Sequence, residues 1–318
     1  MATNIIGDTE WNGLPMPRRF GAIVAVAFGV SLSVIDSVIA NVALPTLASE
    51  FGTSSANSVW IVNAYQLALI TTLLIFSNLG DILGYRRIYI SGLVLFTVAS
   101  AGCALSTTFA SLIAWRAVQG IGAAAITSVN TTLIRIIYPR RMLARGMGIN
   151  ATVVAVSSVA GPSVAAAILS VTTWHWLFAV NLPVGLIAFT LSSRFLPQNP
   201  VKVEGRRFDW RSGVMCALTF GLVMACVEGY SHGMSLHVWF VLAAVAAVVA
   251  WRFVTDQLRK PMPILPFDLL RIPIFSLSIV TSICSFTAQM LAMVSLPFIL
   301  LSALSVFSYV PAGSMYSI

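Results

Sequence analysis

The sequence predicts an all-α membrane protein that crosses the bilayer several times, and three observations support this fold class. Apolar residues make up 58% of the 318 residues, and mean hydropathy is +0.92. Charged residues make up only 9%, against about 25% in a soluble domain. About nine mainly apolar segments have the length of a spanning helix, and we expect them at residues 20–44, 58–79, 88–106, 109–134, 147–170, 174–196, 210–230, 237–255 and 273–302.

The basic residues indicate how these segments are oriented. The loops at 45–57, 105–108, 171–173 and 231–236 contain no Lys or Arg. Of the 18 basic residues, all except Arg116 belong to the N-terminal lead and to the alternate loops. Since cytoplasmic loops are enriched in Lys and Arg, we expect a multi-pass protein of the inner cell membrane with its N-terminus in the cytoplasm.

Composition also argues against several other classes of protein. The net charge of +8 is distributed over alternate loops, which indicates membrane orientation and not a nucleic-acid-binding surface. The cysteines lie in apolar runs without CxxC spacing, so neither a disulfide framework nor a metal site is expected; they are Cys103, Cys216, Cys226 and Cys284. No HExxH, phosphate-binding loop or dinucleotide fingerprint is present. We therefore expect no cofactor and no enzymatic activity.

Two formal charges, Asp36 and Arg116, lie well inside the apolar segments. Each costs about 2.5–3.5 kcal/mol at the centre of an inserted helix, and such residues usually face a bundle interior or an aqueous cavity. Asp36 is expected to bind a proton or a cation; the alternative is a hydrated carboxylate near the outer end of its span. Arg116 shares a helical face with Gln119 and Gly120. It is expected to influence a nearby carboxylate, the alternative being a structural Arg that binds backbone carbonyls.

Two other features within the spans have simpler interpretations. Gly161 and Pro162 lie inside the fifth segment among small residues, which favours a helix hinge whose freed backbone groups are satisfied by neighbouring helices. Glu228 ends the seventh segment near two histidines. We expect it to face solvent on the outer side.

A short charged turn joins the second and third segments. It holds Asp81, Arg86 and Arg87 together with Gly80 and Gly84. Glycine tolerates backbone conformations with positive φ, so both glycines are suited to a tight turn. Taken alone, this pattern is typical of an ordinary loop between two spans.

In their order along the chain, these segments resemble the major facilitator superfamily, and specifically its fourteen-span drug:proton antiporter branch. The residues that carry the resemblance are 36–45 in span one, Trp60, Ala64 and Tyr65 in span two, 78–87 in the following loop, Arg116, Gln119, Gly120 and Gly122 in span four, Gly161 and Pro162 in span five, and 174–183 at the start of span six. The sequence departs from the family pattern at Ser77, Ile82, Ala165 and Ala166.

The resemblance implies a division of the chain into four parts. Residues 1–196 would form the N-terminal six-span bundle, and 197–209 a cytoplasmic loop. Residues 210–255 would be an inserted linker pair of spans. Residues 256–318 would supply a cytoplasmic loop and the first span of a C-terminal bundle that is incomplete. The resemblance thus leads us to expect a truncated chain.

The implied function is proton-coupled export of lipophilic, often cationic compounds. A proton would exchange at Asp36, with Arg116 adjusting its affinity. The expected lining residues of the substrate cavity are Trp60, Tyr65, Gln66 and Gln119, and for the first three the alternative is ordinary packing or interfacial anchoring. The resemblance implies a gating loop at Asp81, Gly84, Arg86 and Arg87, and the hinge is expected at Gly161 and Pro162. Expected partners are the lipid bilayer, protons and small-molecule substrates, with no indication of oligomeric state. The alternative is a nonfunctional or regulatory membrane fragment without transport of its own.

Overall fold

A computed structural model describes residues 13–198, 209–231, 233–260, 269 and 271–288. Within them, every regular element is a helix. The elements are α1 (Arg18–Glu50), α2 (Ser55–Ser58), α3 (Trp60–Leu83), α4 (Tyr85–Ala104), α5 (Phe109–Ile137), a 3-10 turn (Arg140–Met142), α6 (Leu143–Val171), α7 (His175–Ala179), α8 (Asn181–Phe195), α9 (Trp210–Ser231) and α10 (Leu236–Arg259). A further apolar helix covers Pro273–Ala288.

In the described part of the chain, eight helical segments are long and apolar enough to cross a membrane, which confirms the predicted polytopic all-α class. The predicted ninth span, 273–302, is helical over Pro273–Ala288, and the rest of it lies outside the described residues. The predicted span 174–196 is divided into α7 and α8 at Val180. Pro183 has no backbone N–H to donate to the preceding turn, which accounts for the interruption.

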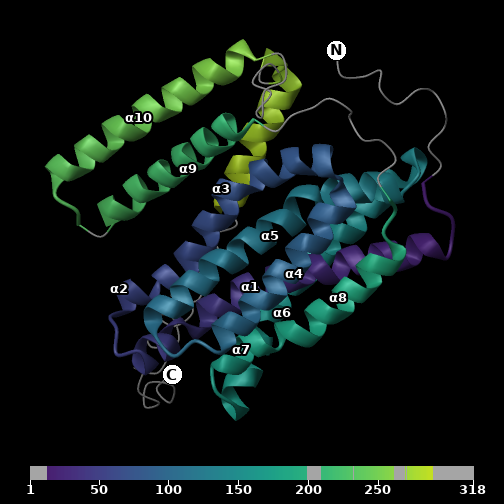
Figure 1. Cartoon of the computed structure of the whole chain (residues 1–318), viewed down its shortest axis with the longest axis horizontal. Helices are drawn as coiled ribbons and strands as arrows, with labels where there is room; N and C mark the ends of the chain where they lie inside the picture. The colour runs from purple at the N-terminus through teal and green to yellow at the C-terminus, as the bar shows by residue number, and fades with distance from the viewer. Residues whose placement is uncertain (1–12, 199–208, 232, 261–268, 270, 289–318) are drawn as a thin grey trace, which may run out of the picture. The chain divides into compact units, whose positions relative to one another are not determined.

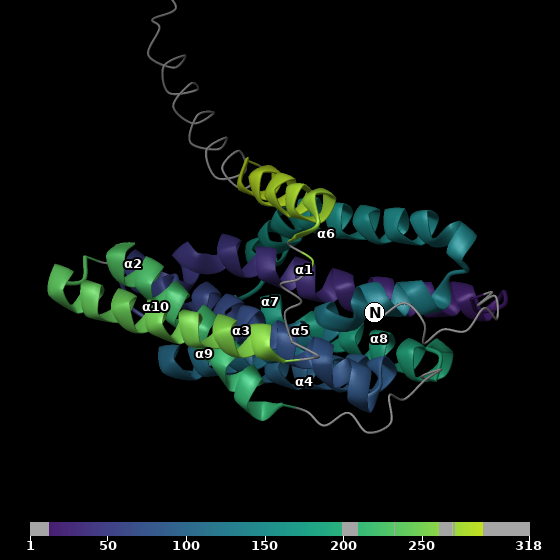
Figure 2. The ribbon, with the colours of Figure 1, turned by 90° about the horizontal axis from the view of Figure 1, so that it is seen from above.

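Residues 1–256 and 257–318 form two compact units. In the first unit, α5 packs along both α3 and α4, while α1 packs against α6 and α8 (Figures 1 and 2). The predicted loop at 197–209 falls largely outside the described residues, so the boundary after residue 196 stays a prediction.

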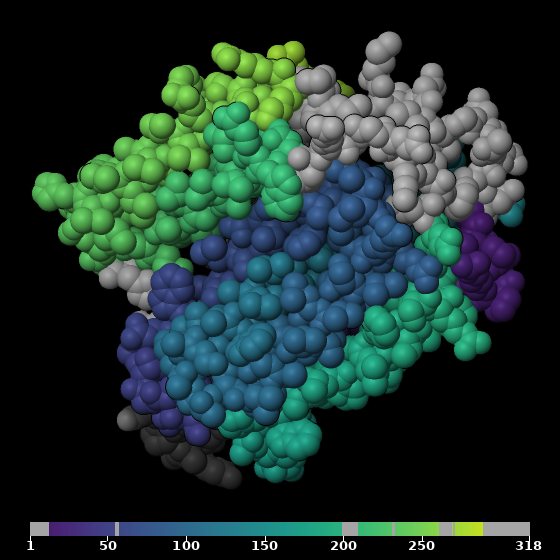
Figure 3. Space-filling model, viewed as in Figure 1, coloured from purple at the N-terminus to yellow at the C-terminus, as the bar shows by residue number. Residues whose placement is uncertain are grey.

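Helix α9 packs against α3, and its green surface adjoins the blue surface of the first helices in Figure 3. Trp239 of α10 donates from Nε1 to the Cys226 carbonyl of α9 at 3.0 Å. Glu228 does not simply face solvent: its Oε1 accepts a hydrogen bond from Asn63 Nδ2 of α3 at 2.5 Å. Tertiary packing of α9 on α3 brings the two side chains together.

Gly120 allows α5 to approach α3 closely. A Cβ at this position would lie 2.3 Å from the Tyr65 carbonyl oxygen and 3.1 Å from Ala68 Cβ. Small residues at such crossings let membrane helices pack backbone to backbone. The backbone of α3 is therefore held near the polar residues of α5.

Replacing Gly120 by Ala is expected to lower the thermal stability of the purified protein, because insertion of a methyl group into a packed contact costs about 1–3 kcal/mol. Gly148→Ala in α6 is the matched control, since a Cβ there meets nothing within 4 Å. Unfolding of both variants in detergent would be followed by size-exclusion chromatography after heating. Equal unfolding midpoints for the two variants would show that the contact between α3 and α5 accommodates a methyl group without loss of stability.

Candidate functional site

A layer of polar side chains lies between two apolar clusters in the first unit. On α1, Asp36 falls between the cluster residues Leu32 and Ile39. On α5, Arg116 and Gln119 likewise fall between the two apolar clusters. These clusters enclose the layer, so any charge in it must be compensated by other protein groups.

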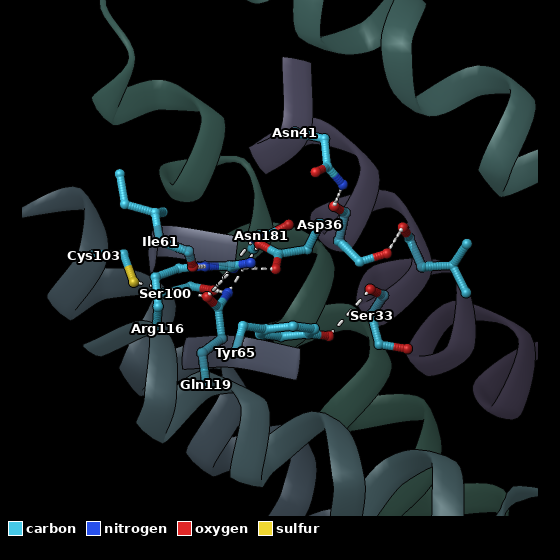
Figure 4. A network of polar contacts seen from close by, with 12 residues as sticks. Ser33, Asp36, Asn41, Ile61, Tyr65, Ser100, Cys103, Arg116, Gln119 and Asn181 are labelled. Carbon is cyan, nitrogen blue, oxygen red and sulfur yellow. Dashed lines mark hydrogen bonds and ion pairs between the residues drawn. The ribbon is translucent and has the colours of Figure 1, made fainter. Parts of the chain in front are cut away.

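Asp36 is held by an ion pair and two amide donors (Figure 4). Its side chain is 1% exposed, and Oδ2 lies 2.6 Å from Nη1 of the fully buried Arg116. Its other oxygen, Oδ1, accepts from Gln119 Nε2 at 2.9 Å and from Asn181 Nδ2 at 2.6 Å. The carboxylate is thus buried and hydrogen-bonded, and the alternative of a hydrated outer carboxylate does not describe this conformation.

Arg116 binds several groups at once. Its Nε donates to the Ile61 carbonyl of α3 at 3.1 Å, and Nη1 also donates to Gln119 Oε1 at 2.7 Å. The guanidinium lies over the Tyr65 ring, 4.3 Å from its centroid, a cation–π geometry. Nη2 is buried without a hydrogen-bond partner among the described residues. Arg116 therefore contacts both a backbone carbonyl and a carboxylate, and its influence on Asp36 stays a prediction.

Ser100 and Asn181 complete the layer, and neither was predicted as a site residue. Ser100 Oγ of α4 accepts from Gln119 Nε2 at 2.6 Å and from Asn181 Nδ2 at 3.3 Å. Asn181 is the first residue of α8. A neutral polar residue within an apolar span is common and gives only a weak signal. Their proximity to Asp36 depends on the packing of α4 and α8.

The structure brings together some of the predicted cavity residues and not others. Tyr65 and Gln119 contact Arg116 directly. Trp60, the first residue of α3, is 39% exposed, and Gln66 is half-buried. Among the described residues, neither of these two takes part in the hydrogen bonds around Asp36. Their predicted contact with substrate stays a prediction.

The charged turn forms local contacts within the bundle. Gly84 ends α3 with φ 105°, in the left-handed region that favours glycine. Tyr85 Oη donates to Asp81 Oδ1 at 2.7 Å, and Arg86 Nη2 donates to the Ser193 carbonyl of α8. Arg87 is exposed beside a groove of about 590 Å³. The gating role of this turn stays a prediction.

The predicted hinge in α6 is a close contact with α1. The helix continues through Pro162, and a Cβ on Gly161 would lie 2.8 Å from the Val38 side chain. Bending at this point stays a prediction.

A cavity of about 350 Å³ adjoins the polar layer. It is lined by residues of α1, α6 and the α7–α8 junction, namely Ala27, Phe28, Ser31, Leu32, Ile35, Val153, Val164, Val180, Asn181 and Val184. Its wall is mainly apolar, and Asn181 belongs both to the wall and to the Asp36 cluster. Across the described residues, no group of His, Cys, Asp or Glu could hold a metal ion.

Known proteins resemble this chain over much of its length. The uncharacterized transporter YebQ of Escherichia coli (strain K12) is 55% identical over 293 residues, covering 92% of this chain and 64% of YebQ. The multidrug resistance protein Stp of Mycobacterium tuberculosis (strain CDC 1551 / Oshkosh) is 29% identical, covering 83% of this chain and 49% of Stp. The chain thus spans less than two thirds of the length of these relatives.

Comparison with solved structures supports the same fold. The crystal structure of the human organic anion transporter MFSD10 matches with a TM-score of 0.53 at 18% identity, covering 65% of this chain and 55% of that one. The model of the Major Facilitator Superfamily matches residues 26–318. Because this match begins inside the first spanning helix and continues through the α9–α10 pair, the chain belongs to the major facilitator superfamily.

Proposed function

We propose that this protein is part of a proton-coupled exporter of lipophilic, often cationic compounds, in the fourteen-span drug:proton antiporter branch. The observation that carries the proposal is the buried ion pair between Asp36 and Arg116. Ionisable residues inside a membrane bundle commonly mark proton relays and ion pathways. Similarity to a relative named as a multidrug resistance protein supports the class of substrate.

The ion pair offers a physical basis for coupling. Protonation of Asp36 would leave the buried charge of Arg116 without its partner, and an uncompensated buried charge is strongly destabilising. The pair in its described, closed arrangement therefore opposes protonation. Proton binding is therefore tied to a second conformation in which the surroundings of the pair rearrange, so the proton and the conformation depend on each other.

The proposed cycle also requires two halves. Alternating access in transporters of this kind involves the movement of one helical bundle against another around a site near the membrane midplane. In the proposal, residues 1–196 are the N-terminal bundle with a cytoplasmic N-terminus, 210–255 are linker spans, and 256–318 begin the second bundle. The charged turn from Asp81 to Arg87 gates the cytoplasmic side.

Dye export from a host that lacks its own efflux pumps tests this proposal. Two proteins would be compared: the 318-residue chain, and the same chain extended by any downstream coding sequence that continues its reading frame. Export of a lipophilic cationic dye that stops when a protonophore collapses the gradient would support the proposal. Export by the extended protein alone would assign the present chain the role of a fragment without transport of its own, and absence of export by both would overturn proton-coupled drug export.

A further inference from the structure

Among the residues that the structure describes, Asn181 alone belongs to both the Asp36 cluster and the wall of the apolar cavity. Its Nδ2 donates to Asp36 Oδ1 at 2.6 Å, and the residue lines the cavity between α1, α6 and α8. It lies at the junction where α7 gives way to α8. A change at Asp36 can therefore reach the cavity wall through a single side chain.

Asp36 Oδ1 has both of its acceptor sites occupied when the carboxylate is ionised. It accepts from Gln119 and from Asn181, whereas Oδ2 accepts from Arg116. A protonated carboxyl carries its own O–H donor, and at Oδ1 this O–H would face two other donors. A proton at Oδ1 therefore requires Gln119 or Asn181 to turn away or to present an acceptor.

Gln119 is poorly suited to that change because both ends of its amide are engaged. Its Oε1 accepts from Arg116 at 2.7 Å, while Nε2 donates to Asp36 and to Ser100. Rotation of this amide would set its N–H groups against the guanidinium. Arg116 has only donors and cannot accept a proton.

Asn181 is held only through its nitrogen. Nδ2 donates to Asp36 and, at 3.3 Å, to Ser100. Its Oδ1 accepts no hydrogen bond from the described residues. Rotation of this amide would break two bonds from Nδ2 and place Oδ1 where it can accept the Asp36 O–H.

From these contacts we propose that Asn181 is a positioning residue that switches with the protonation of Asp36. When Asp36 is ionised, the Asn181 nitrogen binds the carboxylate and its oxygen is available to the cavity. When Asp36 is protonated, the amide rotates, accepts the Asp36 O–H and turns its N–H groups toward the cavity. The inference rests on the proposed function, because it takes Asp36 as the proton-binding group.

The rotation would change which ligand the cavity accepts. An amide oxygen in an apolar wall is complementary to a lipophilic compound with an ammonium or other N–H donor, whereas amide N–H groups leave that donor unpaired. The ionised state would bind such a compound and the protonated state would release it. Such an exchange, in which a proton replaces a bound lipophilic cation, is what an antiporter requires.

The other titratable groups near Asp36 do not account for a switch in the physiological range. Arg116 from α5, Tyr65 from α3 and Cys103 from α4 are the charged or titratable groups that surround Asp36 within the described structure. Arg116 retains its proton, and phenols and thiols ordinarily ionise above neutral pH. The proposal therefore assigns the proton to Asp36.

Infrared titration of the purified 318-residue chain in lipid nanodiscs tests the proposal without requiring transport. The carboxyl band of protonated Asp36 is identified as the band that Asp36→Asn removes. Asn181→Leu is expected to shift this band to higher frequency, because the protonated carboxyl loses the amide oxygen that accepts its O–H. Asn181→Ser is a second variant in case the first does not fold, and Asn181→Gln, which keeps the amide, should lie nearer the wild type.

Asn130→Leu is the matched control. Asn130 is also a buried amide, but it donates to Asn150 of α6 at 3.1 Å and makes no contact with the Asp36 cluster. It should leave the frequency of the Asp36 band unchanged. An unchanged frequency in the folded Asn181→Leu or Asn181→Ser protein would overturn the proposed switch alone, whereas the absence of any band that depends on Asp36 would overturn the proposed proton site itself.

Binding of dyes by the same nanodisc samples tests the cavity. A lipophilic cationic dye is expected to bind about tenfold more weakly to Asn181→Leu than to wild type, while a neutral lipophilic dye of similar size keeps its affinity. Equal losses for both dyes, or a loss for neither, would contradict the role of Asn181 in selecting the ligand.

Discussion

Replacing Asp36 by Asn abolishes proton-driven export if the buried ion pair is the coupling site. The amide is close in size to the carboxylate but binds no proton in the physiological range, so the cycle loses its proton step. The new NH₂ group replaces one carboxylate oxygen. It would face the Arg116 donor at the position of Oδ2 or the Asn181 donor at the position of Oδ1. The expected result is loss of gradient-dependent dye export, together with lower thermal stability.

Two further variants separate this effect from general damage. Asp36→Glu keeps the carboxylate with a longer side chain and is expected to retain part of the activity. Glu50→Gln neutralises a carboxylate at the end of the same helix, where the side chain is exposed, and is expected to export like wild type. Dye efflux would be measured in the transport-competent protein with and without a protonophore. Gradient-dependent export by folded Asp36→Asn would show that the proton binds elsewhere.

Part of this site could be predicted from the sequence because a buried charge is energetically costly in a membrane span. Asp36 and Arg116 could be identified because a charge inside an apolar span is unfavourable without compensation. The spans themselves follow from length and hydropathy, and the structure confirms eight of them. Such signals are local, and they require no knowledge of which helices touch.

The rest of the site depends on contacts between distant segments. Asn181 lies 145 residues from Asp36 in the chain, and no local pattern links an amide in one span to a carboxylate in another. Glu228 was expected to face solvent because its sequence neighbourhood is polar, yet the packing of α9 on α3 supplies Asn63 as a donor. Neutral polar side chains carry little cost in a span, so only the fold shows which of them gather around a charge.

Replacing Arg116 by Ala is expected to have the largest effect on stability. The substitution leaves the Asp36 carboxylate buried without its partner and also removes contacts to Ile61, Gln119 and Tyr65. Breaking a buried ion pair in this way costs about 3–5 kcal/mol. Arg116→Lys keeps the charge, but a single ammonium cannot reproduce the planar fork that binds three groups and stacks on a ring.

The double variant Asp36→Leu, Arg116→Leu separates the energetic role of the pair from its functional role. Replacement of a buried ion pair by apolar residues is often neutral or stabilising, so the double variant is expected to unfold at a higher temperature than Arg116→Ala while exporting no dye. Arg135→Ala removes an exposed Arg from the same helix and should leave the unfolding temperature unchanged. If the double variant were as unstable as Arg116→Ala, the lost packing and hydrogen bonds of Arg116, and not the unpaired Asp36 charge, would explain the effect. Recovery of stability without recovery of export would instead mean that the ion pair is retained for coupling, at the expense of a more stable apolar core.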